Sequence, residues 1–108
     1  MTDPKPDAVS QSYAAKFDDI DRELVHVASI CRVDLLDRAN IERVIRNDAS
    51  VCGVANPVAF EKLRELLMMH YAVRTRAAQA LGEAGAQALI DETVTRIRER
   101  LERLGVIR

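Results

Sequence analysis

The sequence predicts an all-α protein, an up-and-down helical bundle with four helices at about 9–32, 35–46, 57–81 and 85–104. Apolar residues recur at alternating intervals of three and four, as on one face of a helix. Aromatic residues make up only 4% of the chain and tryptophan is absent, so the core is aliphatic and suits helices better than strands. At 108 residues we expect one domain, with a disordered tail over 1–8 and the bundle over 9–108.

The first helix has the strongest periodic signal, a heptad seam sustained for almost three repeats. Asp34 is then the expected N-cap of the shorter second helix, which carries Ile41, Val44 and Ile45 on one side. The seam of the first helix consists of Tyr13, Phe17, Ile20, Leu24, Val27 and Cys31.

The third and fourth helices are marked by their ends. Asn56 is a favoured N-cap, and Pro57 suits the first helical position, where its missing N–H costs nothing. Gly82 is the expected C-cap of the third helix, and Gly105 ends the fourth. Three helices with a bent connector are the main alternative architecture. The seam of the fourth helix consists of Ile90, Val94, Ile97, Leu101 and Leu104.

The connection at 47–56 contains Cys52, placed just before a helix N-terminus, where a thiol pKa can fall. Catalysis would also need a base, but His70 is too far along the third helix and His26 occupies an outward heptad position. No pair among these residues and Cys31 has a standard zinc spacing. We therefore interpret the connection as a hinge and Cys52 as a small hydrophobic residue, and expect no catalytic residue, metal or cofactor.

Charge is nearly balanced overall, at −1, but it is unevenly distributed. Residues 1–21 carry a net −3 and residues 93–108 a net +3, and antiparallel packing would place these ends together. Arginines from Arg96 to Arg103 could follow phosphates on nucleic acid, a third possible function. However, glutamates four residues away are available as partners, and no aromatic residues interleave for base stacking. Nucleic acid is therefore an unlikely partner.

The N-terminal region has no apolar run, so we expect neither a signal peptide nor a membrane span, and a cytoplasmic location.

The third helix is apolar on all sides near its middle, in the segment ELLMMHYAV. Such a helix is covered on all sides, either at the centre of the bundle or by another chain. Adjacent methionines are common on adaptable binding surfaces. The first functional hypothesis is therefore an interaction or regulatory protein that binds a protein partner or itself, as a homodimer. The expected contact residues are Leu66, Met68, Met69, Tyr71 and Arg74.

The alternative function, a helical enzyme or small-anion binder, rests on Arg74 with His70. Heptad steps place both on the core-facing stripe, where an arginine needs an aspartate of the first helix or a bound anion. The segment IDREL, 20–24, resembles the first helix of small all-helical chorismate mutases, which bind a dianion with inward arginines and a lysine. The resemblance covers one or two turns, and the preceding arginine and the lysine of the second helix are absent. No residue role is transferred from it, and we favour a non-enzymatic function.

Overall fold

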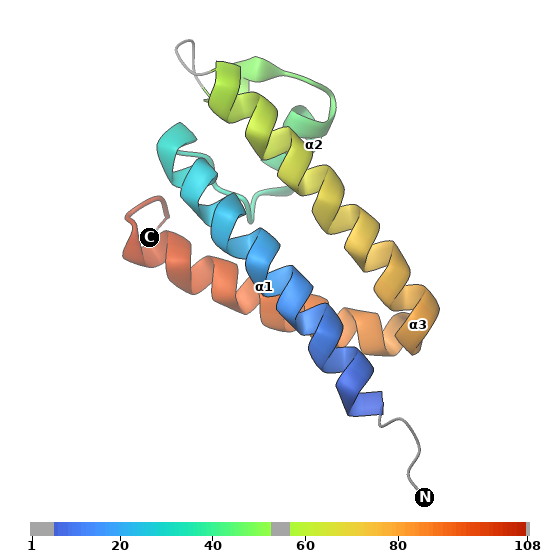
Figure 1. The fold of residues 1–108 in the computed structure, drawn as a ribbon. Helices are drawn as coiled ribbons and strands as arrows, with labels where there is room; N and C mark the ends of the chain where they lie inside the picture. Colours follow the sequence, from blue (N-terminus) through green and yellow to red (C-terminus); the bar gives the residue numbers. More distant parts are fainter. Residues whose placement is uncertain (1–5, 53–56, 108) are drawn as a thin grey trace, which may run out of the picture.

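The computed structural model describes residues 6–52 and 57–107, which form helices joined by turns, with no strand among them (Figure 1). These ranges contain α1 (Pro6–Cys31), α2 (Arg38–Ile45), a short 3-10 helix η1 (Ala49–Cys52) and α3 (Pro57–Arg103). The predicted all-α class is confirmed. The predicted count of four helices is not confirmed, because the segments expected at 57–81 and 85–104 belong to one long helix.

The helix α3 folds back on itself at Gly82, whose φ of 79° and ψ of 168° are not helical. This combination is open essentially only to glycine. We call 57–81 the first arm and 83–103 the second arm. The break expected at Gly82 is present, but helix resumes at the next residue and not at 85. The two arms therefore diverge from one tight corner (Figure 1).

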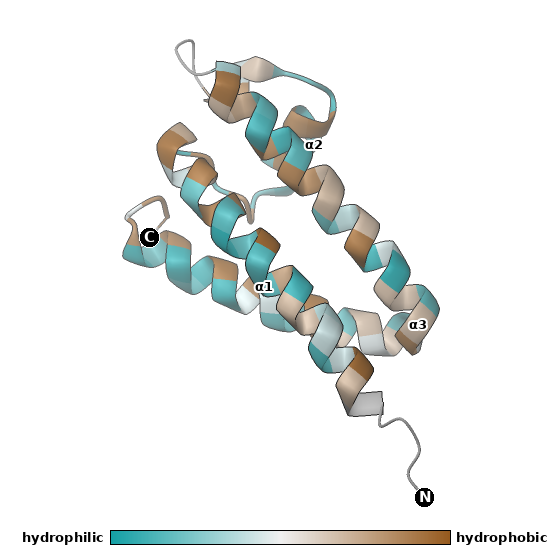
Figure 2. Cartoon of the chain, viewed as in Figure 1, coloured by the Kyte–Doolittle hydropathy of each residue, from teal (hydrophilic) through white to brown (hydrophobic). Residues whose placement is uncertain are grey.

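The helix α1 packs along both arms of α3 and runs antiparallel to the first arm (Figure 1). Its predicted seam is confirmed, because Tyr13 is partly buried and the other five seam residues are buried. The second arm likewise buries Ile90, Ile97 and Leu101, whereas Leu104 lies beyond the end of α3 and is exposed. Apolar and polar segments alternate along each helix, as amphipathic packing requires (Figure 2).

The helix α2 is shorter than predicted, because Asp37 and not Asp34 is its N-cap. The Asp37 carboxylate accepts a hydrogen bond from the Ala39 N–H at 3.0 Å. Asp34 instead closes the preceding turn by accepting from the Leu36 N–H at 2.9 Å. This turn delays the helix by three residues relative to the expected start at 35.

Two other predicted segments are only partly covered. Residues 1–5 of the expected tail lie outside the described part, while α1 already includes residues 6–8. Of the expected hinge, 53–56, with the predicted N-cap Asn56, lie outside it as well. In the described remainder, Asp48 accepts hydrogen bonds from Ser50 and Arg43, which holds the entry to η1. The predicted start of α3 at Pro57 is confirmed.

The core is divided into two apolar clusters along the bundle. The larger lies toward α2 and the ends of α1 and α3, and the smaller lies toward Gly82. Along α1 the boundary falls between Phe17 and Ile20, next to Asp21. Along the second arm it falls between Ile90 and Ile97. Polar side chains occupy this boundary and make up the candidate site.

Replacing Gly82 with alanine should destabilise the protein by about 1–3 kcal/mol, because the backbone conformation is strained for any residue with a Cβ. Added bulk contributes nothing, since a Cβ at this position meets no atom within 4 Å. Urea unfolding measures the change. The nearby exposed Ala84→Ser is the control and should change stability by less than about 0.5 kcal/mol. Equal stability of Gly82→Ala and the control would contradict the conclusion that Gly82 has a backbone conformation open only to glycine.

Candidate functional site

A polar layer of four residues separates the two apolar clusters, with Asp21 on α1, His70 on the first arm, and Thr93 and Arg96 on the second arm. Asp21 and Thr93 are buried, and Asp21 has 0% of its surface exposed. An aspartate is almost never fully buried without a partner, so this layer is the most unusual feature of the core.

Asp21 lies near two basic groups but is bonded to neither. Its Oδ1 is 3.8 Å from His70 Nδ1, and its Oδ2 is 3.9 Å from Arg96 Nη2. Neither carboxyl oxygen has a hydrogen-bond partner of good geometry. Burial therefore dominates and raises the pKa of Asp21 to about 7, although Arg96, Arg100 and the nearby Thr93 hydroxyl act to lower it. The side chain is a neutral carboxylic acid under mildly acidic conditions.

His70 is the opposite case, a base that burial keeps neutral. Its ring packs 5.1 Å from the Phe17 ring and 5.9 Å from the Tyr71 ring, centroid to centroid. Only 13% of its side chain is exposed. Burial, and then the positive charge of Arg74, lower the pKa of His70 to about 4. Between these two pKa values the pair consists of a protonated Asp21 and a neutral imidazole.

Asp18, one turn before Asp21 and nearer to solvent, is the ionised member of the site. It accepts a hydrogen bond from Arg100 at 3.0 Å and pairs with Arg22 at 2.9 Å and Arg96 at 3.7 Å. The bond from Arg100 is the main reason that the pKa of Asp18 is lowered. The two cations of the second arm thus converge on one aspartate of α1.

These contacts bring Asp18 and Asp21 of α1 beside Arg96 and Arg100 of the second arm within one chain. The expected antiparallel packing does not join them, because α1 ends beside the end of the second arm, where Arg32 donates to the Gly105 carbonyl at 3.2 Å. The ion pairs also correct an expectation about the arginines of the second arm. Arg96 and Arg100 turn toward α1, and in the described residues no glutamate of the second arm pairs with an arginine. The four arginines therefore do not form one exposed stripe, which weakens the nucleic-acid interpretation.

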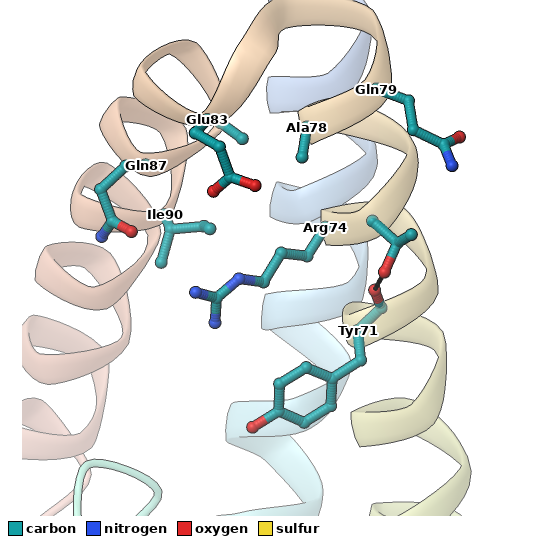
Figure 3. A pocket seen from close by; sticks show the side chains of 9 residues that line it. Tyr71, Arg74, Ala78, Gln79, Glu83, Gln87 and Ile90 are labelled. Carbon is teal, nitrogen blue, oxygen red and sulfur yellow. Dashed lines mark hydrogen bonds between the residues drawn. The ribbon is translucent and has the colours of Figure 1, made fainter.

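A groove of about 530 Å³ runs between the two arms of α3 near the Gly82 corner. Tyr71 and Arg74 point into it from the first arm, and Ile90, Gln87 and Glu83 face it from the second (Figure 3). The hydroxyl of Thr75, which also lines the groove, donates to the Tyr71 carbonyl at 3.0 Å.

A smaller cavity of about 140 Å³ continues from this groove toward α2. Tyr71, Arg74 and Ile90 line both spaces, so the cavity is reached through the groove. His70 and Thr93 bring the polar layer to its wall. The remaining lining residues are aliphatic: Leu24, Leu35, Leu36, Ile41, Leu67, Val94 and Ile97.

The five residues predicted as a contact surface lie in three different places. Leu66 is 2% exposed and belongs to the core. Met68 and Met69 are 50% and 51% exposed. Tyr71 and Arg74 line the groove. Of the aspartates expected to pair with Arg74, Asp18 and Asp21 face other cations, and no carboxylate of the described residues forms an ion pair with Arg74.

The cysteines take no part in this site. Cys31 and Cys52 are buried free thiols of the larger cluster. Burial, and next the neighbouring Cys31 thiol, raise the pKa of Cys52 to about 12, so the thiol stays protonated at neutral pH. Among residues 6–52 and 57–107 no group of three or more His, Cys, Asp or Glu side chains could hold a metal ion.

The sequence contains a signal for the polar layer that the heptad seam conceals. Phe17 and Leu24 of the seam also belong to a second stripe with Asp21 and Ala28, at spacings of four, three and four. In the structure this second stripe is deeply buried, with Asp21 in its middle. Thr93 similarly interrupts the apolar spacing between Ile90 and Ile97. A polar residue inside an apolar stripe was therefore the sequence signal that indicated the polar layer.

Comparison with known protein families, with curated proteins and with solved structures finds no match to this chain. None of the helices described here combines the length and the apolar character needed to cross a membrane.

The opposite pKa shifts predict how stability depends on pH. Between pH 4 and 6.5 the folded pair carries one proton on Asp21, while the unfolded chain carries one on His70, so the two contributions cancel. In Asp21→Asn only His70 remains, the unfolded chain binds more protons, and stability should rise with pH by about 1.4 kcal/mol per unit. In His70→Gln the folded chain keeps the proton of Asp21, and stability should fall with pH at a similar slope.

Urea unfolding at several pH values in this window measures both slopes. The exposed Asp19→Asn is the matched control and should keep the wild-type profile. If Asp21→Asn and His70→Gln change stability with pH in the same direction, the protonation states assigned to the layer are wrong.

Proposed function

We propose that this chain binds a small amphipathic anion, with an apolar group in the cavity and a carboxylate or phosphate at Arg74. The observation that supports this proposal is the single guanidinium of Arg74 at the junction of an apolar cavity and an open groove. Ligand sites are typically apolar pockets with a few converging polar groups and side chains of shifted pKa. This position has each of these features.

The size of the cavity favours an apolar group of about one aromatic ring. An aliphatic cavity of about 150 Å³ is known to accept benzene, and this cavity is about 140 Å³. At its inner end, the His70 imidazole and the Thr93 hydroxyl supply hydrogen-bonding groups. A phenyl or branched alkyl group therefore fits better than a sugar or a nucleoside.

The charge of the groove favours an anion as the second part of the ligand. Arg74 extends from the first arm into the space between the arms, and it forms no ion pair with a described carboxylate (Figure 3). Glu83 also lines the groove, at the Gly82 corner, and opposes anion binding. A planar guanidinium holds a carboxylate or phosphate through two parallel hydrogen bonds, which gives the site orientation as well as affinity.

We expect phenylacetate to raise the midpoint of thermal unfolding in proportion to occupancy, because it binds only the folded chain. At a concentration about 100 times the Kd, the gain is about 2.7 kcal/mol. Acetate, which lacks the ring, and benzyl alcohol, which lacks the charge, should each have a much smaller effect. Differential scanning fluorimetry followed by isothermal titration calorimetry measures these differences.

Substitutions of residues that line the groove test where phenylacetate binds. Arg74→Gln should weaken phenylacetate binding by about tenfold or more, and Glu83→Gln should strengthen it, because the two changes alter the local charge in opposite directions. Arg76→Gln, the same change at an exposed arginine of the first arm that does not line the groove, is the control. If none of a panel of aryl and branched alkyl carboxylates and phosphates stabilises the wild type, the proposal fails.

Self-association through the first arm of α3 is a second candidate, supported by the half-exposed neighbours Met68 and Met69. Flexible, polarisable methionine side chains adapt to a partner surface. Because both side chains already face outward, this candidate does not need the bundle to open. Leu66, Tyr71 and Arg74 lie elsewhere and are not part of it.

The double variant Met68→Asp with Met69→Asp should keep the wild-type helix content and reduce any dimer to monomer, because two charges would be buried at the contact. Light scattering on a sizing column across a range of concentrations measures the mass. Val9→Asp, on another exposed apolar side chain, is the control. A wild type that is monomeric at every concentration would exclude self-association.

A further inference from the structure

We propose that protonation of Asp21 gates the anion site: the site accepts the anion when Asp21 is neutral and rejects it when Asp21 is ionised. This inference rests on the proposed function and names its regulation. It assigns a role in binding to a fully buried carboxyl group that makes no hydrogen bond of good geometry.

Asp21 lies behind the wall of the cavity. His70 lines the cavity, and its Nδ1 is 3.8 Å from Asp21 Oδ1. Arg74 follows His70 by one helical turn on the same face of the first arm and lines the same cavity. A charge on Asp21 is therefore separated from the ligand by one side chain.

The charge of an ionised Asp21 is poorly screened inside the protein. Asp21 has no exposed surface and lies between two apolar clusters, so neither water nor salt intervenes between it and the cavity. Arg74 is exposed, so solvent partly screens an anion bound there, and we expect one added negative charge on Asp21 to weaken anion binding by about tenfold. An exposed aspartate at the same distance would have a much smaller effect.

The groups that surround Asp21 leave it as the one whose charge changes with pH. From α1 it is faced by Asp18, which is ionised and held by Arg100 and other arginines. From the second arm it is faced by the guanidinium groups of Arg96 and Arg100. The first arm contributes His70, which is already neutral, and α2 contributes the aliphatic Ile41 to the cavity.

The pKa of Asp21, raised by burial to about 7, places this change near neutrality. Below that value the acid is neutral and the field of Arg74 is unopposed from the interior. Above it the buried carboxylate cancels part of that field. By linkage, the bound anion raises the pKa of Asp21 further, so that binding near neutral pH takes up protons.

The test is the Kd of phenylacetate, measured by calorimetry from about one unit below to one unit above pH 7. Phenylacetate stays ionised throughout, since carboxylic acids in water titrate well below this range. The wild type should lose about tenfold in affinity as pH rises. Asp21→Asn, which resembles the neutral acid in shape, should bind with the low-pH affinity at every pH. Asp19→Asn, on an exposed neighbour, should keep the wild-type dependence.

The outcomes separate the two proposals. If Asp21→Asn loses affinity with rising pH as the wild type does, or if the wild type binds equally well at both ends of the range, the gate is overturned while the binding site stands. If neither the wild type nor Asp21→Asn, whose gate is permanently open, binds phenylacetate or any other anion of the panel at any pH, the site and the gate are both overturned. Circular dichroism verifies folding, and Asp21→Leu, which continues the apolar stripe, replaces Asp21→Asn if the latter is unfolded.

Discussion

The burial of Asp21 is the constraint around which the bundle is arranged. A carboxyl group without exposed surface is tolerated only where basic or polar groups surround it, and here they come from both arms of α3. Sliding α1 by one turn would place this acid in an apolar cluster and remove Asp18 from Arg100. Buried polar groups of this kind specify register at some cost in stability.

The corner at Gly82 is the second requirement, because it returns the second arm of α3 to α1 without an intervening loop. The arms diverge from this corner, and α1 fills one side of the angle between them (Figure 1). The opposite side is filled near α2 by aliphatic residues and left open near the corner. The groove and the cavity are thus consequences of joining two arms at an angle rather than in parallel.

Much of the architecture could be predicted from local patterns. The seam of α1, the start of α3 at Pro57 and the break at Gly82 follow from periodicity, proline and glycine, which act over a few residues. The partners of charged side chains could not be predicted in this way. Arg96 has a glutamate four residues away in sequence, yet it pairs with Asp18 of α1, because the partly buried pair between helices replaces the exposed pair within one.

The sequence alone determined that this chain is helical, where its long helices are apolar, and that its acidic and basic ends are complementary. These properties depend on the spacing of neighbouring residues. Only the tertiary structure decided that Leu66 is core, that Met68 and Met69 are exposed, and that Arg74 opens into a groove. It also decided that Asp21 and His70 share one buried layer. Helical spacing defines the face on which a residue lies, whereas burial and pKa depend on which face of another segment covers it.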